Sequence, residues 1–278
     1  MDFAVLRTAL MSRGYARRTA EAKIAHDVVL KAVESSGFHD NLTVKGGVVM
    51  SGLTDLARRA TMDMDVDFIH HSLGEASVRR FVARLNRHSD CTISIDGEIV
   101  DLRHQDYRGK RMHLLVTDEK GVSLRTKVDV GVHTYDNVRQ HDYDFRVVTS
   151  PEVVRLLVNP VEQIFAEKLK SLLKIGFVTT RFKDIYDLYY LSSRVRKTAL
   201  KQCLRLFVFD DVRMSEKTVD DIVRRLERIF ANRTFMRRLA NPNVAWLDVA
   251  PDAVAKQLLG FVASMSGKRK KTAGGSSR

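Results

Sequence analysis

The segment Thr61–Phe68 alternates acidic and apolar residues, which is the period of a half-buried β-strand. Its apolar side chains would enter a core, while Asp63, Asp65 and Asp67 would share the opposite face. Three like charges on one strand face repel each other, and nothing within the strand offsets that repulsion. Carboxylates two residues apart lie about 6.6 Å from each other along a strand. Asp63 and Asp65 could therefore lean onto one or two divalent metal ions, and we expect Asp67 to lie outside this pair.

Two other interpretations of this segment compete with a metal site. A D-x-D-x-D pattern also opens a calcium-binding loop, but the sixth position of that loop should be glycine and is Phe68, and the twelfth should be glutamate and is Gly74. A solvated edge strand, in which aspartates discourage pairing with another chain, fits the pattern equally well. The segment alone therefore leaves a catalytic metal site and a solvated strand open.

Composition narrows the class of protein. With 278 residues, the chain can bury one large core or two modest ones, and 44% hydrophobic and 29% charged residues are typical of a soluble globular protein. No apolar run is long enough to span a membrane, and the first eighteen residues do not resemble a signal peptide. Cys91 and Cys203 give no disulfide framework and are expected to be buried thiols. These features predict a cytoplasmic protein without a membrane partner.

Positive charge is concentrated in the second half of the chain. The formal net charge is +13, and residues 1–150 contribute almost none of it, because 22 basic residues there face 21 acidic ones. Residues 151–265 carry 20 basic residues against 13 acidic ones, and residues 266–278 carry five basic residues and no acidic one. The distribution favours a polyanionic partner, although a general role in solubility remains open.

The patterns along the chain predict an α+β fold. Residues 1–36 and 75–88 are expected to be helical, residues 42–44, 62–69 and several segments of 91–133 are expected to be strands, and the patterns after Ser150-Pro151-Glu152 are helical. Asp129 lies on the polar face of one expected strand. If that strand pairs beside 62–69, Asp129 could complete a cluster of three carboxylates, but an ordinary surface position is equally open, because strand register cannot be read from sequence.

A lysine interrupts an apolar helix stripe in the second half. Pro160 begins and Gly176 ends this helix, and Lys168 falls among the residues of its buried face. The ammonium group could extend along the surface to water, or it could enter a charged cavity and meet a phosphate. The stripe itself predicts that the helix tolerates Lys168→Met. Asp184 stands at the start of the next expected helix, where it could simply cap the helix dipole.

Four short motifs occur in an order that resembles the AbiEii/AbiGii family of nucleotidyltransferase toxins. They are K-G-G at 45–47, R-x-T-x-D-x-D at 59–65, A-E-K-L at 166–169 and R-x-K-D-x-Y-D-L at 181–188. The resemblance spans about residues 42–192. It implies a polymerase β-like nucleotidyltransferase domain, which we place over 1–150 with a mixed sheet and N-terminal helices, and a helical domain over 151–265 that completes the active site. Residues 266–278 are rich in glycine, serine and lysine, and this composition predicts a disordered basic tail.

The resemblance also implies an activity. The protein would be the toxin of a toxin–antitoxin or phage-defence system, with a cognate antitoxin encoded nearby. It would use Mg²⁺ to move a nucleotide from a nucleoside triphosphate to RNA, expected to be the 3′ acceptor end of tRNA, and so block translation. A phosphotransferase, or a protein that binds nucleotide or RNA without catalysis, remains an alternative.

Matching motif positions assign roles to individual residues. Asp63 and Asp65 would be catalytic and bind Mg²⁺, with Asp129 as a candidate third ligand. Lys168 would hold the phosphates, and Asp184 would complete the catalytic set. Backbone at Gly46 and Gly47 would approach the triphosphate. Val48 replaces the usual hydroxyl residue, so Ser51 becomes a candidate phosphate contact. The candidate RNA-binding residues are Arg224, Arg225, Arg228, Arg237 and Arg238, for which a solvated helix face is the alternative.

Overall fold

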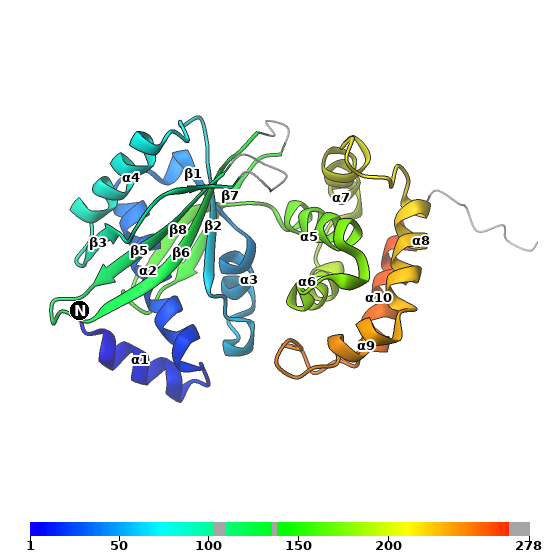
Figure 1. Ribbon diagram of the computed structural model, residues 1–278, viewed down its shortest axis with the longest axis horizontal. Coiled ribbons are helices and arrows are strands. Elements are labelled where there is room, and N and C mark those ends of the chain that lie inside the picture. Colours follow the sequence, from blue (N-terminus) through cyan, green and yellow to red (C-terminus); the bar gives the residue numbers. More distant parts are fainter. Residues whose placement is uncertain (103–108, 135–137, 267–278) are drawn as a thin grey trace, which may run out of the picture. The chain divides into compact units, whose positions relative to one another are not determined.

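The computed structural model describes residues 1–102, 109–134 and 138–266. Residue contacts divide the chain into two compact units, Met1–Pro160 and Val161–Arg278. The first unit combines a β-sheet with helices, and the second is helical (Figure 1). The expectation of an α+β fold with a mixed sheet, followed by helices, is confirmed.

One mixed sheet forms the centre of the first unit. Within the described residues it has eight strands in the order β3-β5-β6-β2-β1-β8-β7, with β4 paired to β5. The aspartate strand β2 lies centrally, antiparallel to β1 and parallel to β6. The strands are β1 (Leu42–Lys45), β2 (Asp63–Phe68), β3 (Thr92–Ile95), β4 (Val100–Asp101), β5 (Lys110–Thr117), β6 (Ser123–Val132), β7 (His141–Arg146) and β8 (Val153–Val158).

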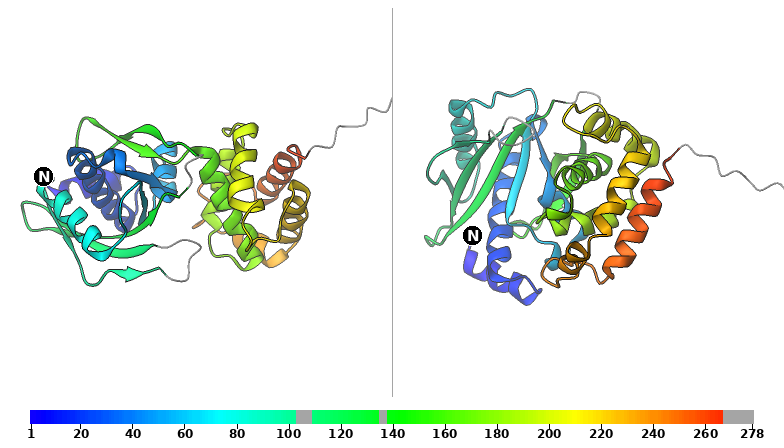
Figure 2. Two further views of the ribbon diagram at one scale, coloured as in Figure 1. Left: turned by 90° about the horizontal axis from the view of Figure 1, so that it is seen from above. Right: turned by 45° about the vertical axis from the view of Figure 1, so that its right-hand side comes forward.

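Helices of the first unit cover the apolar side of β2. The long helix α2 (Arg17–Ser35) packs on β6 and β8 and runs along the sheet in Figures 1 and 2, and α4 (Glu75–Arg87) packs on β3. Met64 and Val66 are buried next to Val29 and Leu30 of α2. The aspartates of β2 alternate with these residues and therefore share the opposite face. The remaining helices here are α1 (Phe3–Ser12), α3 (Gly46–Thr54) and the short 3-10 turns η1 (His39–Asn41) and η2 (Ala57–Arg59).

Residues 153–158 differ from the sequence-based expectation, which was helical after residue 150. They form β8, which pairs parallel with β1 on one side and antiparallel with β7 on the other. Val154, Leu156 and Val158 are buried, and alternate residues are more exposed. The segment Val-Val-Arg-Leu-Leu-Val thus has the two-residue period and the β-branched content of a strand. Its place between two strands assigns β8 to the first unit.

The second unit is built from amphipathic helices. The helix α5 packs against α6 and α7, and α10 packs against α6 and α8; Figures 1 and 2 show these helices gathered into a bundle. Thr218 and Asp221 form a reciprocal capping box at the start of α8. The helices are α5 (Val161–Ile175), η3 (Gly176–Val178), α6 (Phe182–Ser192), α7 (Lys197–Leu204), the π-helical turn η4 (Arg205–Phe209), α8 (Val219–Phe230), α9 (Arg233–Leu239) and α10 (Pro251–Ala263).

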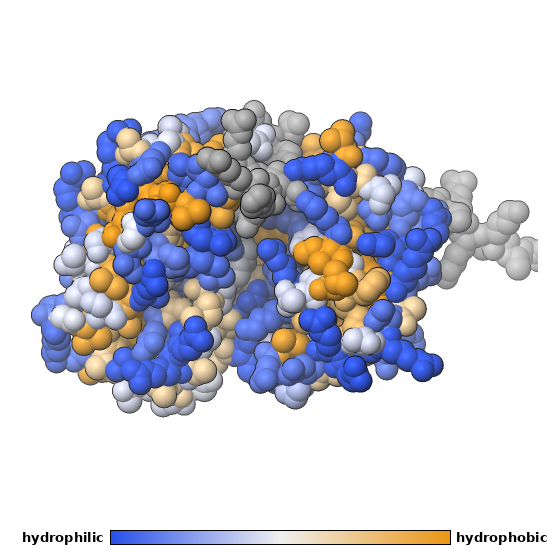
Figure 3. All heavy atoms as spheres, in the orientation of Figure 1, coloured by the Kyte–Doolittle hydropathy of each residue, from blue (hydrophilic) through white to orange (hydrophobic). Residues whose placement is uncertain are grey.

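Surface character agrees with the composition. Most of the face drawn in Figure 3 is hydrophilic, and hydrophobic atoms form smaller patches on it. Among the described helices, none combines the length and the apolar character that crossing a bilayer demands. Both cysteines are buried free thiols, as expected, and burial raises the pKa of Cys203 to about 11.

Candidate active site

The polar face of the sheet brings charged residues from four strands into one row. The register places Lys45 of β1 beside Asp65 of β2, Asp65 beside Asp129 of β6, and Asp129 beside Arg111 of β5. Neighbouring strands lie about 4.8 Å apart, so Asp65 and Asp129 are close neighbours. The strand that carries Asp129 therefore does pair beside the aspartate strand, which was the condition for a three-carboxylate cluster.

Basic side chains from the neighbouring strands compensate the acidic face. The ammonium group of Lys127 lies 2.8 Å from Oδ2 of Asp63. Lys45 lies 2.7 Å from Oδ1 of Asp67, a contact that is an ion pair without hydrogen-bond geometry, because this oxygen has no hydrogen-bonded partner. Such partners were missed by sequence reasoning, which considered only the strand itself. The signal was present in the alternation of β6, where Lys127 and Asp129 share one face.

Arg111 pairs with Asp129 through two nitrogen atoms. Its Nε and Nη2 atoms donate to Oδ1 and Oδ2 of Asp129 at 2.8 and 2.7 Å. Both oxygens of this carboxylate, whose side chain is only 7% exposed, are thus engaged by one guanidinium group. A two-pronged arginine–carboxylate contact is among the stronger polar contacts in proteins.

The carboxylates of Asp63 and Asp65 suit a divalent cation such as Mg²⁺ that also binds the phosphates of a substrate. Within the described part of the chain, no group of three or more His, Cys, Asp or Glu residues is arranged to hold a metal by itself. Mg²⁺ does not require such a group, since it is usually held by one or two carboxylates together with substrate phosphates and water. Asp63 and Asp65 supply two carboxylates, and the side chain of Asp63 is 47% exposed.

The glycine pair is required by a close approach of α3 to the aspartate strand. Gly46 has a φ of +64°, and a Cβ there would lie 2.6 Å from Oδ2 of Asp65. A Cβ on Gly47 would lie 2.5 Å from Oγ1 of Thr61, whose hydroxyl donates to the carbonyl of Asp63. The first helical residue is Gly46, and the preceding Lys45 gives no side-chain cap. The first N–H groups of α3 thus lie beside Asp65, where a phosphate could accept from them.

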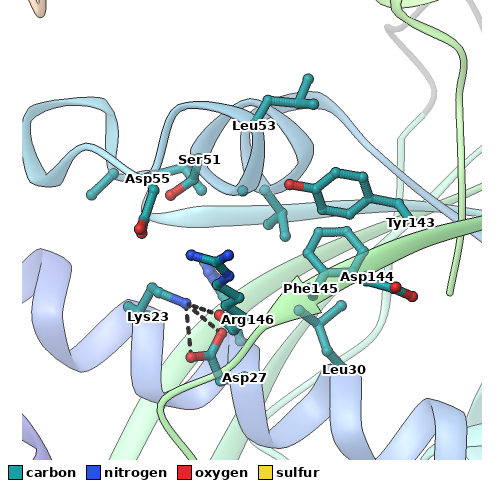
Figure 4. A pocket seen from close by; sticks show the side chains of 15 residues that line it. Lys23, Asp27, Leu30, Ser51, Leu53, Asp55, Tyr143, Asp144, Phe145 and Arg146 are labelled. Carbon is teal, nitrogen blue, oxygen red and sulfur yellow. Dashed lines mark hydrogen bonds and ion pairs between the residues drawn. The ribbon is translucent and has the colours of Figure 1, made fainter. Parts of the chain in front are cut away.

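Ser51 lies beside a cavity of the first unit. It lines a cavity of about 350 Å³ between α2, α3 and β7, which none of Gly46, Asp63 and Asp65 lines. In Figure 4, Lys23 points toward Asp27 while Tyr143 and Phe145 lie on another side of the cavity. The ammonium group of Lys23 donates to both oxygens of Asp27 at 2.8 Å. This cavity is also lined by Thr61, the residue that a Cβ on Gly47 would meet.

Two buried titratable groups of α2 also line this cavity. Burial lowers the pKa of His26 to about 3, the charge of Lys23 adds to that effect, and a hydrogen bond to the Met62 backbone opposes it. Burial raises the pKa of Asp27, against the effects of Lys23 and of the Val148 amide. No sequence pattern indicated these groups, because helical periodicity does not distinguish a buried polar side chain from an exposed one.

In the second unit, the A-E-K-L and R-x-K-D-x-Y-D-L motifs meet. The ammonium group of Lys168 lies 2.5 Å from Oδ1 of Asp184 and 2.9 Å from Oδ2 of Asp187. The side chain of Asp187 is fully buried, and that of Lys168 is 10% exposed. Lys168 therefore sits in a buried charge cluster instead of extending along the surface. Asp184, in the first turn of α6, directs its carboxylate to this lysine.

The five candidate RNA-binding arginines divide into two groups. Arg224 pairs with Asp221, Arg225 donates to the carbonyl of Leu173, and Arg238 stacks over the ring of Phe182 with its Cζ 4.9 Å from the ring centroid. These three thus have contacts within their own unit. The other two, Arg228 and Arg237, are exposed and make no hydrogen bond or ion pair within the part of the chain that the structure describes. Of the expected basic tail, residues 267–278 lie outside the described residues.

Comparison with known proteins gives the family. The model of a family described as "Nucleotidyl transferase AbiEii toxin, Type IV TA system" matches residues 28–252. An antigenic nucleotidyltransferase-like protein from Paracoccidioides brasiliensis, known from a crystal structure, is 13% identical; the alignment covers 77% of this chain and 92% of that chain, with a TM-score of 0.42. That likeness is too distant to support an argument, and no curated protein matches significantly. The family match includes all four motifs and most of both units, and the chain belongs to the AbiEii nucleotidyl transferase toxin family.

Proposed function

We propose that this protein is the toxin of a toxin–antitoxin pair and that it transfers a nucleotide from a nucleoside triphosphate to RNA with the help of Mg²⁺. The expected acceptor is the 3′ end of tRNA, whose modification would block translation. Family membership supports a nucleotidyltransferase toxin with a cognate antitoxin. The observation that carries the proposal is the close approach of Gly46 to Asp65, which brings the start of a helix that has no side-chain cap from Lys45 to a carboxylate of the sheet.

The residues of the first unit suit this reaction. The acceptor hydroxyl gives its proton to a carboxylate, its oxygen forms a bond to the α-phosphorus, and pyrophosphate leaves. Bound Mg²⁺ would neutralise charge on the triphosphate and on the attacking oxygen. Asp63 and Asp65 would hold it, with Asp129 beside them in the sheet. The backbone N–H groups at Gly46 and Gly47 would orient the phosphates, because N–H groups at a helix start attract anions.

Lys168 and Asp184 are proposed to take part from the second unit. Their motifs match the family, and they are joined by an ion pair with the buried Asp187 as a third member. A lysine already held by two carboxylates has a fixed position and loses little conformational freedom when it binds a phosphate. Arg228 and Arg237 remain the candidates for contacts with RNA phosphates, since their guanidinium groups are exposed.

Radioactive labelling tests this function. Purified protein is incubated with RNA and each nucleoside triphosphate, labelled at either the α or the γ position, with Mg²⁺ or with a chelator. Transfer of the α label alone, dependent on Mg²⁺ and abolished by Asp65→Asn, is the expected result. Asp96→Asn is the matched control, because Asp96 is also an aspartate paired with a basic residue, Arg125, but it belongs to none of the four motifs. Transfer of the γ label would instead identify a phosphotransferase.

A non-catalytic nucleotide-binding role is the second candidate. It is favoured by one observation, namely that Asp63, Asp67 and Asp129 are each paired with a basic side chain. Binding of triphosphate without transfer of either label would support this alternative.

A further inference from the structure

Asp129 and Arg111 form a pair whose geometry limits what Asp129 can bind. The guanidinium group contacts both carboxylate oxygens, at 2.8 and 2.7 Å. Asp129 is also the register partner of Asp65, one of the two proposed metal ligands. The carboxylate that lies across from Asp65 in the sheet is thus already bound to a cation of the protein itself.

A divalent cation and the guanidinium group would compete for this carboxylate. A metal ion bound by Asp129 would stand within a few ångströms of Arg111, and like charges at that distance repel strongly in a partly buried site. Arg111 is the member that can move, because its side chain is 34% exposed whereas that of Asp129 is 7% exposed. The neighbouring pair differs, since Lys127 contacts Asp63 through Oδ2 at a more exposed position.

We propose that Arg111 is the resident counter-cation of Asp129 and is exchanged for the metal ion when metal and nucleotide load together. This inference rests on the proposed function. In the nucleotide-free protein Arg111 neutralises Asp129 and lowers the affinity of the carboxylates for a divalent cation. The triphosphate supplies further oxygen ligands and negative charge, so the exchange becomes favourable only in its presence. Arg111 is accordingly a positioning residue that makes metal binding depend on substrate.

Metal binding measured without catalysis tests the exchange. Free Mn²⁺ is followed by electron paramagnetic resonance during titration of the full chain, with and without a nucleoside triphosphate. Without nucleotide, R111M should bind Mn²⁺ about tenfold more tightly than the wild type, since the lost contact is a charge-assisted pair of hydrogen bonds. K110M is the matched control, because Lys110 is adjacent on β5 but points to the other face and pairs with Asp101. Its affinity should equal that of the wild type.

Two further variants locate the effect. The double variant D65N/R111M should lose the tighter Mn²⁺ binding of R111M. This result would assign the bound ion to the site that includes Asp65. R111K keeps a charge but loses the two-pronged contact, so its affinity should lie between those of wild type and R111M. R111K also carries the test if R111M does not give a folded protein, as judged by circular dichroism.

The outcomes separate this inference from the proposed function. If the wild type binds Mn²⁺ with nucleotide but R111M and R111K bind it no more tightly than the wild type without nucleotide, Arg111 is not a competing cation and the inference is overturned. If neither the wild type nor any variant binds Mn²⁺ with nucleotide, the metal-dependent function itself fails.

Discussion

The ammonium group of Lys168 lies between the carboxylates of Asp184 and Asp187, and this position decides the effect of removing it. From the apolar stripe alone, Lys168→Met was expected to be tolerated. The structure argues against tolerance, because Asp187 is fully buried and would lose its counter-charge. Breaking a buried ion pair from one side costs about 3–5 kcal/mol. We therefore expect Lys168→Met to lower the free energy of unfolding by about this amount, measured by urea denaturation.

A control variant and a second substitution test whether the loss of stability comes from the buried charge cluster. Lys201→Met, at an exposed position of α7, should leave stability almost unchanged. Adding Asp187→Leu to Lys168→Met should restore part of the loss, since it removes the unpaired buried charge. Equal stability of the two lysine variants would show that the cluster contributes nothing to folding.

His26 makes stability depend on pH with a defined sign. Its pKa is about 3 in the folded protein and 6.5 when unperturbed, so between these values the unfolded chain binds a proton that the folded chain does not. Its stabilising contribution is complete above pH 6.5 and is lost progressively as the pH falls toward 3. On acidification, the free energy of unfolding should fall less steeply in His26→Gln than in the wild type, by up to ~1.4 kcal/mol per pH unit. Urea denaturation at pH 7, 6 and 5 measures this difference.

The residue next to His26 in α2, Asp27, bears on the design of that experiment. The raised pKa of Asp27 acts in the opposite direction, because the folded state then holds its proton to higher pH. Asp27 is present in both the wild type and His26→Gln, so its contribution cancels when the two are compared. His88→Gln, at the exposed end of α4, is the control and should follow the wild type. An unchanged pH dependence in His26→Gln would remove His26 as the cause.

At the scale of elements, the junction of β1 and α3 depends on Gly46. Gly46→Ala meets two penalties, a positive φ and a Cβ only 2.6 Å from Oδ2 of Asp65. Gly97→Ala meets the first alone, since its φ is +85° and no atom lies within 4 Å of the added Cβ. We expect Gly97→Ala to cost about 1 kcal/mol and Gly46→Ala to cost more, with loss of nucleotide transfer. Thermal melts and α-labelling of RNA measure the two effects.

A difference between these two variants is the essential result. Equal destabilisation, with transfer retained in Gly46→Ala, would mean that the approach of α3 to Asp65 is unimportant for the site. Because both positions have positive φ, the comparison isolates the contact from the backbone strain.

Local sequence patterns predicted helices and strands better than they predicted which residues pair between them. The aspartate strand, the strand at 42–44 and the helices at 1–36 and 75–88 follow from periodicity. The pairing of Asp129 with Arg111 and of Lys168 with Asp187 does not, because register and helix packing join residues distant in sequence. The strand β8 was missed for a related reason. Its alternation was overlooked after Pro151, which marked the end of the preceding pattern but not a change of structural class.

At the scale of the whole molecule, β8 sets where the chain can be divided. A fragment of residues 1–160 retains β8 between β1 and β7, whereas a fragment of residues 1–150, the boundary expected from sequence, lacks it. Without β8, the central strand β1 loses one neighbour and β7 loses its only described partner. We expect fragment 1–160 to unfold cooperatively on heating and fragment 1–150 to lack a cooperative transition, as followed by circular dichroism. Cooperative unfolding of both fragments would contradict this assignment of β8.

The charges on the polar face also bear on how the sheet finds its pairing. The apolar residues of β5 and β6 repeat every second position, so a slip of two residues keeps the same side chains in the core. In the native register Arg111 meets Asp129, but a slip of two residues would set it against Lys127 in one direction and against Gly131 in the other, so either slip loses the ion pair. Refolding of R111M should therefore be slower than that of K110M, and equal rates would contradict this view. The charged residues of the polar face would thus also select the correct strand alignment, which the hydrophobic core alone cannot do.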